Sequence, residues 1–172
     1  KKKKNLRLID ASLFTFSEVL KFSSASENIL IQSEDKQILT KKDFRIVSKK
    51  KPSKSQFNDL IFAFNVCRYV KSNAIVLATN KTTVGIGSGQ PSRLDSCQIA
   101  INKLIKFTNP SSDVVAASDA FFPFIDGIEK LVQSGVRAVI QPAGSIRDKE
   151  VIKFANDTDT VLVFSKTRHF RH

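Results

Sequence analysis

The chain has 172 residues, with 28 Lys and Arg against 16 Asp and Glu, and a formal net charge of +12 at pH 7. This length suits one domain or two small ones, and it is long enough to fold without a disulfide or metal. No apolar run approaches the roughly 20 residues that a membrane-spanning helix needs. We therefore expect a globular protein with no membrane partner.

The positive charge is concentrated in the first third of the chain. Residues 1–54 hold 14 basic and 6 acidic residues, whereas residues 55–172 hold 14 and 10. Lysine runs at 1–4 and 49–51 are of a kind that can bind nucleic-acid phosphates. No aromatic residues are interleaved with these runs, as binding of single strands requires. We interpret the lysines as a solvated surface and do not expect a nucleic-acid partner, although a small polyanion remains open.

The ends and the cysteines of the chain give two further expectations. The chain contains no Met and begins with four lysines. Because translation starts with Met, we expect a processed chain or a piece cut from a longer one. Cys67 and Cys97 have no recognisable metal-ligand spacing and fall in predicted helices, so we expect buried thiols in a reducing cytoplasm.

Short apolar runs separated by polar stretches predict strands and turns in the first part of the chain. The polar residues 18–26 predict a loop or a short helix. A turn-like stretch at 33–36 separates two apolar runs, and it predicts a hairpin between strands at 29–31 and 37–39. The other strands expected here are 5–9 and 44–47.

Regular periodicity begins after Pro52. Apolar residues between Phe57 and Cys67 are spaced three and four apart, which indicates one face of a helix, and Ser53 or Ser55 can cap its first turn. From Lys71 onward, predicted strands and helices alternate across short loops. This alternation predicts a layered α/β domain with helices packed on a sheet. The predicted strands are 74–78, 83–86, 114–117, 138–140 and 161–164, and the predicted helices are 92–107, 126–134 and 147–155.

Three glycines, Gly85, Gly87 and Gly89, lie between a predicted strand and a predicted helix. Glycines let the backbone approach a ligand, and the N–H groups at a helix start attract anions. A tight connection that needs positive φ would also explain them. The dinucleotide fingerprint G-x-G-x-x-G fails here, because its last position is Gln90.

Residues 121–124 read Phe-Phe-Pro-Phe. Three rings so close together cannot all face the core from one regular element, and Pro123 favours a loop. Phe rings on a loop at the carboxyl end of a strand would form a wall for a flat heteroaromatic ligand. The alternative is ordinary core packing beneath the loop.

Two other segments carry groups suited to chemistry. Arg168, His169, Arg171 and His172 lie in the last five residues, which indicates either phosphate recognition beside a titratable imidazole or a frayed terminus. Asn73 precedes a predicted buried strand, and its amide could hold a carboxamide or an oxyanion, or simply occupy a turn. No zinc-deaminase, G-x-S-x-G or P-loop motif occurs.

Taken together, five ordered blocks within residues 57–172 resemble the bifunctional purine biosynthesis proteins, which combine AICAR transformylase and IMP cyclohydrolase. The match is to the carboxyl-terminal part of the transformylase region. The blocks are YVKSNAIV from Tyr69, VGIGSGQPSR from Val84, ASDAFFPF from Ala117, IQPAGSIRD from Ile140 and the terminal RHFRH from Arg168.

The resemblance implies a three-layer α/β/α sandwich, cytidine-deaminase-like and without zinc. Residues 55–172 would be the second of two such units, and residues 1–54 would be a basic segment of short strands leading into it. The first unit, with a catalytic Lys-His pair, and the cyclohydrolase domain would lie upstream of residue 1. The chain alone would then be an inactive fragment.

The activity implied is a formyltransferase of purine biosynthesis. It moves the formyl group of 10-formyltetrahydrofolate to the 5-amino group of AICAR, and the full-length protein also cyclises the product to IMP. The implied setting is a cytoplasmic homodimer with shared active sites. The alternative that the residues leave open is a non-catalytic purine-nucleotide or RNA-binding α/β module.

The resemblance also assigns roles to residues. Asn73 matches the Asn that orients the substrate carboxamide, and His172 matches a terminal His near the same catalytic site. Arg168 matches the Arg that holds the nucleotide phosphate, and Phe121 matches a Phe whose backbone contacts the nucleotide. In some members a monovalent cation such as K+ lies near the residue that Asp119 matches, and no other metal is implied. The folate side is expected to involve Arg93, Leu94, Pro123, Phe124, Asp126 and Ser145, with Gly87 and Gly89.

Overall fold

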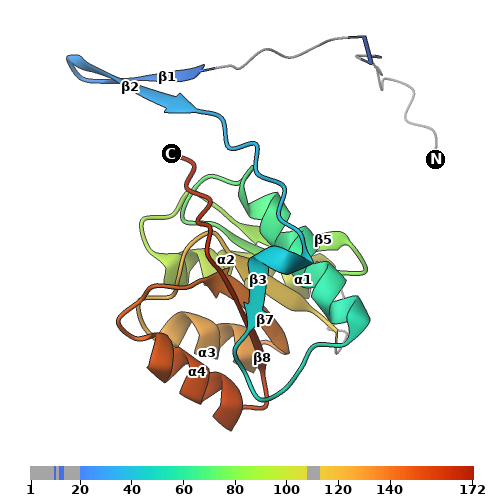
Figure 1. The fold of residues 1–172 in the computed structure, drawn as a ribbon. Coiled ribbons are helices and arrows are strands. Elements are labelled where there is room, and N and C mark those ends of the chain that lie inside the picture. Colours follow the sequence, from blue (N-terminus) through green and yellow to red (C-terminus); the bar gives the residue numbers. More distant parts are fainter. Residues whose placement is uncertain (1–9, 11, 14–19, 108–112) are drawn as a thin grey trace. The chain divides into compact units, whose positions relative to one another are not determined.

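The computed structural model describes residues 10, 12–13, 20–107 and 113–172 (Figure 1). The chain divides into two compact units between Lys36 and Gln37, and each is described by itself. Within the described ranges, no helix combines the length and the apolar character that crossing a bilayer would demand. The strand expected at 5–9 lies outside the described residues.

The first unit contains an antiparallel hairpin of β1 (Leu20–Ala25) and β2 (Asn28–Ser33). Two expectations were therefore wrong. Residues 20–25 form a strand rather than a loop or helix, and the strand at 29–31 pairs backward with β1 rather than forward with 37–39. Ser23 and Ser24 interrupt the alternation of apolar and polar residues in β1, so the strand was not recognised. A two-residue turn with Ser26 at φ 54° closes the hairpin.

One face of this hairpin carries four apolar side chains, together with Ser24 and Ser33. Phe22 lies opposite Ile31 across the pair, and alternation places Leu20 and Ile29 on the same face. All four side chains are more than half exposed.

The second unit is built on a six-stranded mixed sheet with the strand order β3-β8-β7-β6-β4-β5. Strands β6, β7 and β8 are parallel, whereas β4 runs antiparallel to both β5 and β6, and β3 runs antiparallel to β8. A short 3-10 helix, η1 (Lys41–Asp43), leads into β3. The strands are β3 (Phe44–Ile46), β4 (Ile75–Thr79), β5 (Thr82–Gly87), β6 (Val115–Ser118), β7 (Ala138–Pro142) and β8 (Val161–Ser165).

Helices cover both faces of this sheet (Figure 1). Val76 of β4 packs in one core cluster with α1, whereas its neighbour Ile75 packs in a second cluster with the other three helices. Successive side chains of a strand point to opposite faces, so the two clusters are the two interlayer cores. The predicted α/β class, with helices on both sides of one sheet, is confirmed. The helices are α1 (Lys54–Cys67), α2 (Arg93–Phe107), α3 (Asp126–Gln133) and α4 (Asp148–Asp157).

The predicted boundaries of these helices have identifiable causes. Ser53 caps α1, because its Oγ accepts from the Gln56 N–H at 3.1 Å and the Gln56 side chain accepts from the Ser53 N–H. Gly135 follows the end of α3 at φ +99°, a conformation that glycine adopts readily. The expected strand at 44–47 is also confirmed, as β3 on the edge of the main sheet.

Two glycines of β5 let α2 lie directly on the sheet. A Cβ at Gly87 would stand 1.8 Å from the carbonyl oxygen of Ser96, and one at Gly85 would stand 2.2 Å from that of Ala100. The helix backbone therefore occupies the space that side chains would need. This contact fixes the beginning of α2, at Arg93, against β5 and its partner β4.

Candidate functional site

Strand pairing brings the loops of interest together. Because β4 is antiparallel to β6, its first residue, Ile75, lies opposite Ser118, the last residue of β6. The loop that carries Asn73 and the loop that begins at Asp119 therefore meet at one edge of the sheet. The backbone N–H of Asp119 donates to the carbonyl oxygen of Ala74 at 3.2 Å and joins the two loops.

The amide of Asn73 is held by the loop that precedes α2. Its Nδ2 donates to the carbonyl oxygens of Gln90 and Pro91, at 2.9 Å each. The carbonyl oxygen of Asn73 in turn accepts from the Ser96 hydroxyl at 2.8 Å. Both hydrogens of the amide are thus used, so Oδ1 is the atom that remains to accept a hydrogen bond from a ligand.

Arg93 stands at the first turn of α2 and reaches across to the end of β6. Its Nε donates to the Ser118 Oγ at 2.9 Å, and its Nη2 donates to the Asp119 Oδ1 at 2.8 Å. The Asp119 side chain is fully buried, and that of Arg93 is 11% exposed. The guanidinium is therefore fixed by a buried ion pair beside the loops described above.

The three Phe rings of the loop after β6 have different surroundings. Phe122 is buried in the core, whereas Phe124 is 51% exposed and lies 4.7 Å from the Arg147 guanidinium. The backbone N–H of Phe122 donates to the side-chain oxygen of the buried Gln141 at 3.3 Å. Core packing therefore accounts for Phe122 and leaves Phe121 and Phe124 nearer the surface.

Two adjacent cavities lie at this edge, and Asn73 and Pro91 line both of them. The first has a volume of about 450 Å³, and the second has a volume of about 330 Å³. The first is lined by Asn73, Pro91, Ser92, Arg93, Leu94, Phe122, Pro123, Phe124, Asp126 and Gly127. The second is lined by Ser72, Asn73, Gly89, Gln90, Pro91 and His172.

The end of the chain packs against this edge. Ser72 donates its N–H to the Arg171 carbonyl at 2.9 Å, and the Arg171 N–H donates to the Ser72 hydroxyl at 3.1 Å. The His169 N–H donates to the Asp119 carbonyl at 3.0 Å, and the buried His169 ring lies 4.9 Å from that of Phe64. These bonds place His172 at the wall of the second cavity.

Arg168 and Phe121 form a stacked pair. The guanidinium lies 4.7 Å from the centre of the Phe121 ring, and one of its nitrogens lies 3.4 Å from where a Cβ of Gly144 would stand. Gly144 has φ +107°, so a side chain there would be strained as well as close to Arg168. Within the described ranges Arg168 takes part in no salt bridge. Its charge is therefore available to an anionic group.

Two of the residues predicted for the folate side line neither cavity, and Phe121, Asp119 and Arg168 also lie outside both linings. Ser145 lies in the loop before α4, where its N–H donates to Asp148 and its Oγ accepts from the Arg147 N–H. Gly87 lies beneath α2, where its lack of a side chain is required by packing. The folate roles expected of both residues stay predictions.

Sequence reasoning missed two polar residues of this region. Ser118 and Gln141 are buried in otherwise apolar strands, and they hold Arg93 and Phe122, respectively. Their signal was a polar residue at the end of an apolar run.

The cation expected near Asp119 stays a prediction. Its Oδ2 is buried and has no hydrogen-bond partner among the described groups. A carboxylate oxygen of this kind suits a small cation, so the residue fits the expectation. In the described part of the chain, no group of three His, Cys, Asp or Glu side chains could hold a metal ion.

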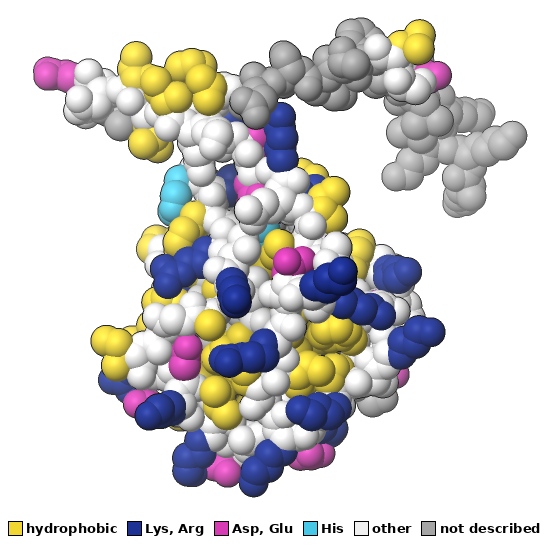
Figure 2. Space-filling view, in the orientation of Figure 1, with side chains coloured by type: hydrophobic (Ala, Val, Ile, Leu, Met, Phe, Trp, Pro, Cys, Tyr) yellow, Lys and Arg dark blue, Asp and Glu magenta, His cyan; other side chains and the backbone are white. Residues whose placement is uncertain are grey.

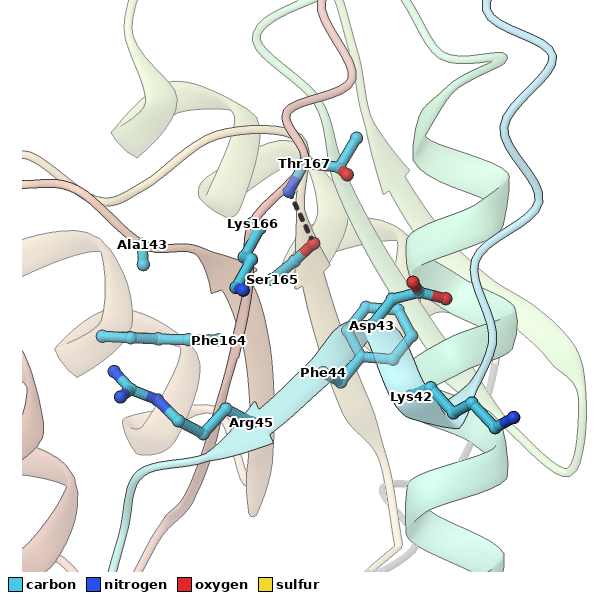
Figure 3. A pocket seen from close by; sticks show the side chains of 9 residues that line it. All are labelled: Lys42, Asp43, Phe44, Arg45, Ala143, Phe164, Ser165, Lys166 and Thr167. Carbon is cyan, nitrogen blue, oxygen red and sulfur yellow. Dashed lines mark hydrogen bonds between the residues drawn. The ribbon is translucent and has the colours of Figure 1, made fainter.

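Another cavity, of about 510 Å³, lies between β3 and the end of β8 and shares no residue with those above (Figure 3). Lys42, Arg45 and Lys166 line it, and Figure 3 shows Lys42 pointing away from the other two. Figure 2 shows Lys and Arg side chains scattered over this face of the second unit, with Asp and Glu between them.

Comparison with known proteins identifies the family. A sequence model of the AICARFT/IMPCHase bienzyme matches residues 1–103. The bifunctional purine biosynthesis protein PurH of Chlorobium phaeobacteroides is 43% identical over 171 residues, and that of Persephonella marina is 43% identical over 172 residues. The PurH of Neisseria meningitidis is 41% identical over 170 residues.

Each match covers 99% of this chain but only 32–33% of the relative. The chain thus spans about a third of the length of the curated relatives that it matches. The family model matches more than half of the chain, so the chain belongs to the AICARFT/IMPCHase bienzyme family.

Proposed function

We propose that the chain is part of an enzyme that transfers the formyl group of 10-formyltetrahydrofolate to the 5-amino group of AICAR. The observation that carries this proposal is the convergence of Asn73, Arg93 and Phe124 on one cavity. Asn73 and Phe124 come from two loops that meet because β4 pairs with β6, and Arg93 comes from the first turn of α2. Membership of the family supports the same activity.

The two cavities divide the substrates between them in this proposal. The pterin lies in the first cavity against Leu94, Pro123 and Phe124, since flat ring systems bind between apolar walls. AICAR lies toward the second cavity, with its carboxamide at Asn73, which lines both. Its phosphate is bound by Arg168, whose guanidinium is held on the Phe121 ring.

For this reaction, this part of the protein must orient the substrates more than it must supply a strong base. The amine of AICAR is a poor nucleophile, because its lone pair is delocalised into the ring and carboxamide. Asn73 Oδ1 accepts a hydrogen bond from the carboxamide N–H and holds that group in the productive rotamer. Positioning two substrates in this way can lower a barrier by about 7–11 kcal/mol without a covalent enzyme intermediate.

Proton transfer belongs to groups that this chain shares with the remainder of the protein. His172 lines the second cavity beside Asn73, close to where the AICAR amine would lie. The Lys-His pair implied for the first transformylase unit would complete the site, together with the partner subunit of a cytoplasmic homodimer.

The proposal also covers the architecture. Residues 55–172 form the second of two cytidine-deaminase-like units without zinc, and residues 1–54 lead into it. The layered sheet with α1 on one face and three helices on the other supports this assignment. Pairing of β3 with β8 adds Phe44–Ile46 to the sheet of that unit.

A chimera tests the proposal. This chain would replace its matching segment in the Persephonella marina relative, and formyl-AICAR formation from AICAR and 10-formyltetrahydrofolate would be measured. We expect transfer at a rate comparable to that of the parent, and loss of transfer when Arg168 is changed to Ala at subsaturating AICAR. A folded chimera that binds AICAR but does not transfer the formyl group would contradict the proposal. That result would favour a non-catalytic purine-nucleotide-binding module.

A further inference from the structure

Asp119 joins the three segments that build the candidate site. Its backbone N–H donates to the carbonyl oxygen of Ala74, the neighbour of Asn73, at 3.2 Å. Its carbonyl oxygen accepts from the N–H of His169, the neighbour of Arg168, at 3.0 Å. Its carboxylate accepts from Arg93 at 2.8 Å. One buried residue thus connects the amide, the guanidinium of the first cavity and the end of the chain.

The Arg93 guanidinium is held from one side only. Of its five N–H groups, one donates to Ser118 and one to Asp119. The remaining N–H groups have no hydrogen-bond partner among the described residues, and Arg93 lines the first cavity. The two contacts fix the plane of the guanidinium and leave its other donors for an oxygen acceptor on a ligand, such as a carbonyl or carboxylate.

The buried environment of Asp119 strengthens this ion pair. Asp119 is fully buried, and its second oxygen has no hydrogen-bond partner in the described structure. The buried carboxylate is shielded from water, so its attraction to Arg93 is weakly screened, and breaking the pair would leave a buried charge without compensation. Removing the charge of Asp119 would therefore release Arg93.

We propose that Asp119 is a positioning residue, which holds the Arg93 guanidinium at the wall of the first cavity. This assignment rests on the proposed function. Asp119 does not touch substrate and acts through Arg93. Ser118 sets the rotation of the same guanidinium through Nε. The competing explanation is that the ion pair only stabilises the fold.

The first test needs no ligand. In the full 172-residue chain, the Nε–H resonance of Arg93 is assigned by its loss in Arg93→Lys, and its exchange with water is measured by NMR. We expect Asp119→Asn to accelerate exchange by about tenfold or more, because weakening the charge-assisted bond from Nη2 lets the guanidinium move away from Ser118, the acceptor of Nε–H. Asp157→Asn, which breaks the exposed pair with Lys153 on α4, is the matched control and should change nothing. Exchange in Asp119→Asn equal to that of the parent chain would overturn the proposal.

A second variant covers loss of folding. If Asp119→Asn does not fold, Ser118→Ala keeps the carboxylate and removes the acceptor of Nε, together with the bond that the Ser118 hydroxyl donates to the Ala120 carbonyl. Its Arg93 Nε–H should then exchange faster than in the parent chain. An unchanged rate in this variant would overturn the proposal equally.

The second test separates positioning from plain stability. In the chimera, Arg93→Ala, Asp119→Asn and the double variant are compared for kcat and for the Michaelis constant of the formyl-folate substrate. Positioning through Arg93 predicts that Asp119→Asn adds nothing to Arg93→Ala, whereas a structural role predicts that their effects multiply. If the parent chimera transfers no formyl group but the NMR effect is found, the proposed function fails and the placement of Arg93 by Asp119 stands.

Discussion

The guanidinium of Arg168 lies over the ring of Phe121, 4.7 Å from its centre, and has no acidic partner among the described residues. The ring therefore orients a charge that a phosphate can use. Changing Phe121 to Leu should weaken AICAR binding about two- to fivefold, the usual contribution of an exposed cation–π contact. Arg168→Ala should weaken it about tenfold or more, since a charged hydrogen bond is lost.

Titration calorimetry of the chimera with AICAR measures both effects. Arg45→Ala is the control, because Arg45 lines a cavity that shares no residue with the candidate site. Unchanged AICAR affinity in Arg168→Ala would remove this residue from the phosphate site.

Asn73 gives the second prediction. Asn73→Asp places a carboxylate against the carbonyl oxygens of Gln90 and Pro91, where the amide now donates two hydrogen bonds. Formyl transfer should fall at least about tenfold, and the free energy of unfolding should fall by about 1–3 kcal/mol. Asn73→Ala should also reduce transfer by at least about tenfold, through the lost acceptor.

The cyclohydrolase reaction of the chimera is the internal control for Asn73. Cyclisation of supplied formyl-AICAR should remain near normal in both variants. Loss of the two activities together would point to misfolding rather than to a missing hydrogen bond.

The glycines of β5 give a third prediction, on stability. Gly87→Ala would force a methyl group to within 1.8 Å of the Ser96 carbonyl, so α2 would have to move away from the sheet. We expect a loss of about 3 kcal/mol or more in urea unfolding, at the upper end of overpacking effects. Gly135→Ala is the comparison, because its φ of +99° strains a side chain but no atom lies within 4 Å. It should cost about 1–2 kcal/mol, and an equal loss in both variants would show that helix contact is not the cause.

The buried thiols give a fourth prediction, on pH dependence. Burial raises the pKa of Cys97 to about 12 from an ordinary value of 9.0, and it raises the pKa of Cys67 as well. The folded chain therefore keeps the neutral thiol between these values, while the unfolded chain ionises. Stability from this source is complete below pH 9.0 and is lost as the pH rises toward about 12.

Urea unfolding at a series of alkaline pH values measures this loss. Each thiol should lower the free energy of unfolding by about 1.4 kcal/mol per pH unit in that window. Cys97→Ala should show a shallower decline than the parent chain, whatever its stability at neutral pH. A decline of equal slope would exclude Cys97 as a contributor.

The sequence predicted helices and strands correctly where the apolar residues of an element are buried and repeat with the period of that element. Helix α1 and strand β4 were predicted because their apolar spacings match one helical face and one buried strand. The hairpin in the first unit was mispredicted because Ser23 and Ser24 interrupt the apolar pattern of β1 and the side chains of residues 20–24 are exposed, so no burial shapes that pattern.

The candidate site was predictable only in part. The loops around Asn73 and Phe121 stood out by composition, whereas the ion pair of Arg93 with Asp119 joins positions 26 residues apart. That contact depends on the antiparallel register of β4 and β6, which no local pattern encodes. Contacts between distant loops follow from strand pairing. Hydrophobic periodicity predicts single helices and strands, but it does not predict which strands pair.

The packing of α2 on the backbone of β5 has a consequence for ligand binding. The helix cannot slide or tilt without clashing with the strand, so the wall at Arg93 exists before any substrate arrives. Preorganisation of this kind spares the entropic penalty of ordering a flexible wall on association. A rigid inhibitor that fits this wall should therefore bind more tightly than a flexible analogue with the same contacts. The flexible analogue loses conformational entropy when it binds, and its affinity is lower by that amount.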